Sequence, residues 1–98
     1  MLTVTSVHGV TIRLTEERWE HIVEEHPELE QLQHTVLRAV SEPEVVLSGY
    51  EDEVTAVRTL TSGRRLGVVY RITNGDGFII TAFYVKARYY DRRTQLWP

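Results

Sequence analysis

The chain has 98 residues, 42% of them hydrophobic, values that suit one compact domain over residues 1–98 and exclude a disordered chain. It has no cysteine, which excludes disulfides and thiolate metal sites and favours a cytoplasmic location, and no apolar run approaches the ~20 residues that cross a membrane. The net charge of −3 is divided into −9 for residues 1–53 and +6 for residues 54–98, which predicts either a polyanion-binding surface or an acidic half packed on a basic one.

The first predicted element is a β-hairpin over residues 2–15. Threonine and valine alternate along this stretch, as in a strand with one buried face. The alternation breaks at His8-Gly9, where a two-residue turn is expected, although histidine is an unusual first turn residue.

Two helices are predicted next. Thr15 is the expected N-cap, and one face of the helix that follows carries Trp19, Ile22, Val23 and His26. Pro27 disfavours helical geometry at His26, so the first helix should end there, and the same proline suits the first position of a second helix. The apolar side of that second helix consists of Leu29, Leu32, Val36, Leu37 and Val40.

The rest of the chain predicts strands. Runs rich in β-branched and aromatic residues cover 44–48, 54–60, 65–72 and 77–90, and Asn74-Gly75 is a strong hairpin signal between the last two. We therefore expect an α+β fold: an N-terminal β-hairpin, two α-helices, then a four-stranded antiparallel sheet packed against the helices.

The two histidines near the first helix could serve metal binding, proton transfer or neither. His21 and His26 are five residues apart, about 140° around a helix, so they do not share a zinc site and no metal is expected. His26 lies on the apolar stripe, facing the sheet, while His21 lies within reach of Glu17 and Glu25. These positions suit a general acid–base histidine. They equally suit a helix cap and a solvent-exposed polar residue.

Basic and aromatic side chains interrupt the predicted strands. Because adjacent strands lie ~4.8 Å apart, such side chains can gather on one sheet face, where arginine forks and aromatic rings suit phosphates and bases. We predict a compact positive surface formed by Arg58, Lys86 and Arg88 with Arg71, separate from the acidic first helix. The alternative is that these charges protect edge strands from aggregation.

A resemblance to a known family rests on the stretches “TEERWEHIVEEHPEL”, “VVYRI” and “GFIITAFYVKAR”, and on Trp97. The chain resembles small phage- and toxin-associated proteins of the barnase–EndoU–colicin–RelE-like (BECR) ribonuclease superfamily. The resemblance spans roughly residues 11–97. It implies two helices on a four-stranded antiparallel sheet and a toxin-type endoribonuclease that needs no metal or other cofactor. In the implied reaction a ribose 2′-hydroxyl attacks the adjacent phosphate and leaves a 2′,3′-cyclic end.

The strand residues and the resemblance together give the candidate site residues and partners. The catalytic candidates are His26, His21, Thr81 and Arg58. The substrate-binding candidates are Tyr70, Arg71, Tyr84, Lys86 and Arg88. The expected partner is RNA, with an antitoxin protein and a second copy in a homodimer as further partners to test, and no membrane is expected. The alternative function is a catalytically inactive protein of the same fold that binds a protein partner.

Overall fold

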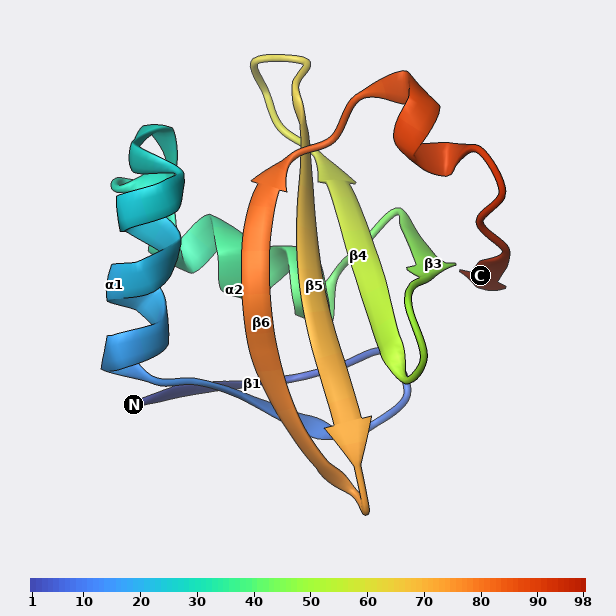
Figure 1. The fold of residues 1–98 in the computed structure, drawn as a ribbon, viewed down its shortest axis with the longest axis horizontal. Helices are drawn as coiled ribbons and strands as arrows, with labels where there is room; N and C mark the ends of the chain where they lie inside the picture. The colour runs from blue at the N-terminus through green and yellow to red at the C-terminus, as the bar shows by residue number, and fades with distance from the viewer.

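The computed structural model describes residues 1–98 as two α-helices and one seven-stranded sheet (Figure 1). The strands lie in the order β1-β2-β6-β5-β4-β3-β7, and all neighbours are antiparallel except β2 and β6. The elements are β1 (Leu2–Thr5), β2 (Thr11–Leu14), α1 (Glu16–Glu25), the 3-10 helix η1 (Pro27–Leu29), α2 (Gln33–Ser41), β3 (Val45–Ser48), β4 (Glu53–Thr59), β5 (Arg65–Thr73), β6 (Asp76–Tyr84), the 3-10 helix η2 (Ala87–Tyr90) and β7 (Gln95–Trp97).

The α+β class is confirmed, but the prediction of a four-stranded antiparallel sheet is wrong. Strands β3 to β6 form the expected antiparallel meander, and three further strands extend it. β2 joins β6 in parallel at Ile12 and Gly77, while β7 pairs with β3 at the other edge. A Cβ atom on Gly77 would lie 2.3 Å from Ile12 Cδ1 and 3.0 Å from the Thr11 carbonyl oxygen. Only glycine therefore lets β2 approach β6 this closely.

The N-terminal hairpin is confirmed, with a longer turn than expected. β1 and β2 are antiparallel, and residues 6–10 connect them. Ser6 organises this loop, because its amide donates to the Val10 carbonyl and its hydroxyl accepts from the amides of His8 and Val10. A five-residue loop, held by hydrogen bonds from its own amides to the buried Ser6 side chain, thus replaces the expected two-residue turn.

The first helix begins and ends where predicted, but the second does not. The Thr15 hydroxyl accepts from the Arg18 amide at 3.1 Å, and His26 leaves the helix with φ −133° and ψ 70°. Pro27 opens only the single turn of η1, and α2 begins at Gln33. η1 and residues 30–32 connect the two helices, so that α1 contacts β6 and α2 contacts β5.

The Asn74-Gly75 hairpin is confirmed. β5 and β6 are antiparallel, and both turn residues have positive φ angles, 54° and 77°, as a tight hairpin turn requires. The last predicted strand is shorter than expected, because β6 ends at Tyr84 and residues 87–90 form η2.

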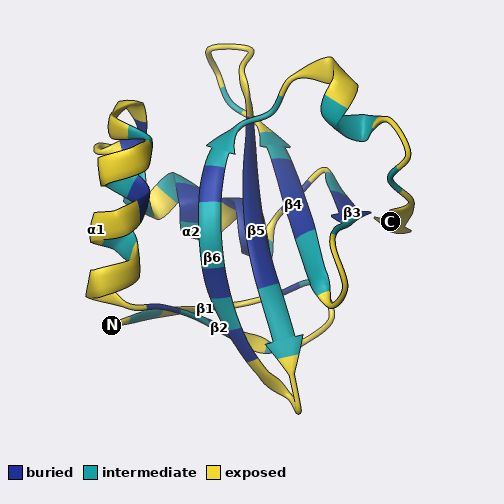
Figure 2. Ribbon diagram, in the orientation of Figure 1, coloured by how far each residue is buried: buried dark blue, intermediate teal, exposed yellow.

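The hydrophobic core lies between the sheet and α2. Leu66, Val68 and Tyr70 of β5 are fully buried on this side, against Val36 and Val40 of α2. α1 lies beside β6 at the edge of the sheet, with most of its outer surface exposed (Figures 1 and 2). No helix is long and apolar enough to span a membrane.

The opposite face of the sheet is partly covered by residues 85–97, which we call the C-terminal strap. Its first residue, Val85, fills the space that a side chain at Gly67 would occupy, since a Cβ there would lie 2.4 Å from Val85 Cγ2. The strap then passes through η2 and ends as β7 beside β3 (Figure 1). The strap leaves only part of this face exposed.

The contact at Gly77 gives a stability prediction. Gly77→Ala should lower the free energy of unfolding by about 1–3 kcal/mol, because the added methyl meets Ile12 and a backbone carbonyl in a packed interior. Chemical denaturation measures this. Thr3→Ala, an exposed change on β1, is the control and should shift stability by less than ~0.5 kcal/mol. Equal effects of the two substitutions would contradict the close β2–β6 packing.

Candidate functional site

His26 lies at the edge of the strap-covered face of the sheet. The residue follows the last turn of α1, and its ring centroid is 6.4 Å from that of Phe83 on β6. Its side chain is 30% exposed, and its Nδ1 atom lies 3.7 Å from a carboxylate oxygen of Glu28. The imidazole is therefore held beside the sheet yet remains in contact with solvent, as a proton-transfer group requires.

His21 lies apart from this position. The residue is exposed on α1, and its side chain makes no hydrogen bond or ion pair. The expected contacts with Glu17 and Glu25 are not formed. No group of three His, Cys, Asp or Glu side chains is arranged to hold a metal ion.

A row of side chains crosses the sheet from His26 to β4. The Phe83 ring packs edge-on against Tyr89 of η2 at 5.2 Å, and the Tyr89 hydroxyl hydrogen-bonds Thr55 Oγ1 on β4 at 2.7 Å. Thr81 belongs to the same face, because its cross-strand neighbour Val69 is itself the neighbour of Thr55. His26 and Thr81 thus approach one part of the sheet, with Phe83 between them.

Arg93 holds the strap against the sheet, over the side chains of Phe83, Tyr89 and Thr55. Its guanidinium donates to the carbonyls of Tyr89 at 2.8 Å and Ser48 at 3.1 Å, and it lies 3.9 Å from the Tyr89 ring centroid. The Thr94 amide also donates to the Ser48 hydroxyl. Arg93 therefore holds the strap and is not available as a phosphate ligand.

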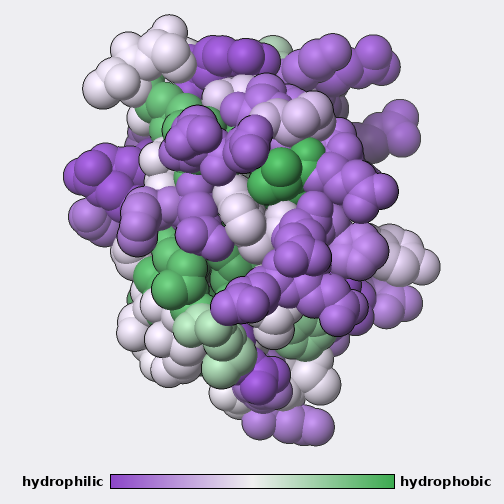
Figure 3. All heavy atoms as spheres, turned by 90° about the vertical axis from the view of Figure 1, so that its left-hand side faces the viewer, coloured by the Kyte–Doolittle hydropathy of each residue, from purple (hydrophilic) through white to green (hydrophobic).

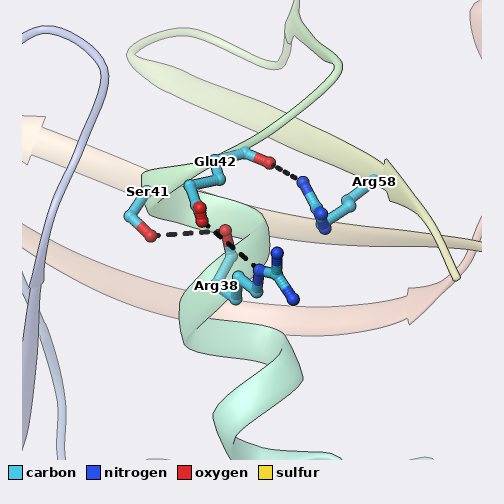
Figure 4. Close-up of polar contacts among 4 residues, drawn as sticks. All are labelled: Arg38, Ser41, Glu42 and Arg58. Carbon is cyan, nitrogen blue, oxygen red and sulfur yellow. Dashed lines mark hydrogen bonds and ion pairs between the residues drawn. The ribbon is translucent and has the colours of Figure 1, made fainter.

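Arg58 points to the helix side of the sheet, away from His26. Its guanidinium donates to the carbonyl of Glu42, which follows the last turn of α2, close to the Arg38–Glu42 ion pair (Figure 4). The Ser41 hydroxyl donates to the Arg38 carbonyl at the same end. A cation suits this place because the last carbonyls of a helix lack amide partners. The structure gives Arg58 a capping contact in place of the expected catalytic position.

The two tyrosines predicted to bind substrate also lie on the helix side. Tyr70 is fully buried, its hydroxyl has no hydrogen-bond partner within the chain, and burial raises the pKa of that hydroxyl. Tyr84 is opposite Leu66, and the Arg64 guanidinium lies 3.7 Å from its ring centroid. Tyr70 is therefore closed to substrate, whereas Tyr84 is half-exposed and reaches the surface near the β4–β5 turn.

The predicted positive surface of Arg58, Arg71, Lys86 and Arg88 is wrong. Arg71 lies on the same face as Thr81, but it is bound by Asp52 at 2.8 Å and Glu53 at 2.9 Å near the far end of β5. Arg58 lies on the other face. Only Lys86 and Arg88 remain together, exposed at the start of the strap.

A different basic cluster forms where the β4–β5 turn meets the start of the strap. One hollow of about 330 Å³ is lined by three cations and no carboxylate: Gly63, Arg64, Arg65, Tyr84, Val85 and Lys86. A second hollow of about 340 Å³ shares Arg65 and is lined by Glu44, Val45, Val57, Thr59, Arg65 and Tyr90. Arg64 and Arg65 are not among the site residues predicted from the sequence, where they were interpreted as surface or phosphate-steering charges. Their position directly after the “TSG” turn was the available signal, since a tight turn brings them beside the end of β6.

Glu44 is the one carboxylate in these two hollows. The Thr59 amide donates to it, and this hydrogen bond, with the nearby guanidiniums of Arg58 and Arg65, lowers the pKa of the Glu44 carboxyl. Glu44 is therefore ionised at neutral pH and presents a negative acceptor beside Arg65.

Comparison with protein-family models, with curated protein sequences and with solved structures finds no match to the chain. Any assignment of function therefore rests on the residues and their geometry.

The lowered pKa of Glu44 predicts a pH-dependent contribution to stability. Since the folded-state pKa lies below the ordinary glutamate value of about 4.3, this contribution is present above that value and is lost as the pH falls through the folded-state pKa. Unfolding of the wild type and of Glu44→Gln should be compared from neutral to acidic pH. The stability difference should shrink on acidification. A difference that stays constant or grows would contradict the assignment.

Proposed function

We propose that the protein is a metal-independent endoribonuclease that cleaves RNA at the end of the sheet between His26 and the start of the strap. Five cationic side chains near the β4–β5 turn and the strap carry the proposal, because they neither pair with a carboxylate nor hydrogen-bond to the chain: Arg64, Arg65, Lys86, Arg88 and Arg92. Unpaired cations beside half-exposed aromatic rings suit a polyanion that also offers bases for stacking.

The position of His26 supports cleavage in addition to binding. Its ring lies beside that of Phe83, which packs against Tyr89 in the strap, so the start of the strap, with Lys86 and Arg88, borders the same surface. In the proposed reaction His26 accepts the proton of a 2′-hydroxyl, and the oxygen forms a bond to phosphorus. The bond from phosphorus to the 5′-oxygen breaks, and that oxygen takes a proton from solvent. Lys86 and Arg88 stabilise the charge that develops on the phosphate.

Replacing each histidine separately tests the reaction. His26→Ala should lower the rate of RNA cleavage by roughly 10²–10⁴, the usual loss for an acid–base residue, whereas His21→Ala should cleave like the parent. The measurement uses mixed RNA with a metal chelator, and the 2′,3′-cyclic ends are quantified. Circular dichroism first shows that both variants fold. Equal activity of His26→Ala and the parent, or no cyclic ends from any RNA with the parent, would contradict the proposal.

A second candidate function, binding of a basic protein partner such as an antitoxin, rests on the outer face of α1. A hollow of about 410 Å³ is lined there by Trp19 and Val23 with Glu20, Glu24 and Glu30. None of these three carboxylates makes an ion pair. Figure 3 shows this side of the molecule as mostly hydrophilic with separate hydrophobic patches. An apolar hollow bordered by carboxylates suits an apolar side chain flanked by Lys or Arg.

The fluorescence of Trp19 tests this second function. The chain has two tryptophans, so Trp97→Phe leaves Trp19 as the sole reporter. A lysine-rich amphipathic peptide should change its emission saturably and less so at high salt. Glu20→Gln with Glu24→Gln should abolish the change, and Glu17→Gln with Glu25→Gln, on the same helix but outside the hollow, should preserve it. An equal response from both pairs would exclude this docking site.

A further inference from the structure

The hollow at the β4–β5 turn has the features of a phosphate site. It is lined by Arg64, Arg65 and Lys86, and no acidic residue borders it. The Arg64 guanidinium is held on the ring of Tyr84, so less side-chain freedom is lost when it binds an anion. Gly63, with φ 90°, forms the tight turn that places the two arginines in succession.

The neighbouring hollow has different chemistry. Val45 and Val57 give it an apolar floor and Tyr90 an aromatic wall, with the Arg65 guanidinium 5.5 Å from the Tyr90 ring centroid. One Glu44 oxygen accepts from the Thr59 amide, and the Thr59 side chain also hydrogen-bonds this carboxylate. A phosphate would be repelled by this carboxylate, whereas a planar group with an amino donor would be accepted.

We propose that the two hollows on either side of Arg65 form one nucleotide-binding site, with phosphate held by Arg64, Arg65 and Lys86 and the base held by Tyr90 and Glu44. The choice of a nucleotide as ligand rests on the proposed ribonuclease function. The site would fix the substrate beside the cleavage position, because Lys86 lies two residues beyond Tyr84, the last residue of β6, and three beyond Phe83.

The site makes Glu44 a specificity residue. Cytosine and adenine each offer an exocyclic amino group to the Glu44 carboxylate, which can accept more hydrogen bonds than those from Thr59. Uracil presents its single ring N–H between two carbonyl oxygens, which the carboxylate repels. The protein should therefore bind amino-bearing bases more tightly than uracil, and the preference should depend on Glu44.

Binding of dinucleotides to the His26→Ala protein tests the site without cleavage. CpC and ApA should bind more tightly than UpU in calorimetric titrations. Arg64→Gln and Lys86→Gln should each weaken all three by a similar factor, about two- to fivefold, with a shallower salt dependence. Glu44→Gln should narrow the difference between CpC and UpU. Arg18→Gln, which removes the same charge from exposed α1, is the control and should change nothing.

The outcomes separate this inference from the proposed function. Equal binding of CpC and UpU to the His26→Ala protein, or an Arg64→Gln effect no larger than that of Arg18→Gln, would overturn the inference while leaving cleavage by His26 intact. Base-dependent binding that needs Arg64 and Glu44, in a protein that cleaves no RNA, would support the site and refute the ribonuclease. The inference would also be overturned if Glu44→Gln left the difference in affinity between CpC and UpU unchanged.

Discussion

Five consecutive residues of β5, from Leu66 to Tyr70, are buried, so the central strand needs cover on both faces. Leu66, Val68 and Tyr70 pack toward α2 and form the core. Gly67 and Val69 face the other way, where no α-helix packs and the C-terminal strap supplies the cover. β5 is thus buried on both faces, which is usual for strands of parallel sheets but not for an antiparallel meander. This requirement explains why residues 85–97 return across the sheet instead of extending β6.

The way the strap leaves the sheet determines where the candidate site lies. Val85 occupies the space above Gly67, and the Tyr89 hydroxyl hydrogen-bonds Thr55. The segment between Val85 and Tyr89 therefore leaves the sheet at the end of β6. This segment carries Lys86 and Arg88 and lies near the edge where α1 ends in His26. A packing requirement of the central strand therefore brings a histidine and unpaired cations to one end of the domain.

Local chemistry made much of the fold predictable, while non-local pairing did not. Thr15 and Asn74-Gly75 act within a few residues, and the elements they begin or connect lie where expected. The parallel contact between β2 and β6 depends on Gly77, which lies far from β2 in the sequence. The residues of β2 therefore carry no local pattern that predicts this contact. For the site, the helical wheel placed His26 at the sheet. Arg58 was misplaced, because alternation along β4 puts it on the face opposite Thr55, where it donates to the Glu42 carbonyl. An irregularity in β6 between Ile79 and Thr81 made the facing of later residues ambiguous from alternation alone.

The central claim is that RNA lies across the end of the sheet between His26 and the strap. NMR chemical-shift mapping with a 2′-O-methyl oligonucleotide, which lacks the attacking hydroxyl and is not cleaved, tests it most directly. The account predicts saturable shifts at His26, Thr81, Phe83 and residues 84–88, weakening with salt. Shifts confined to α1, or no saturable shifts on the sheet at any concentration of oligonucleotide, would contradict it.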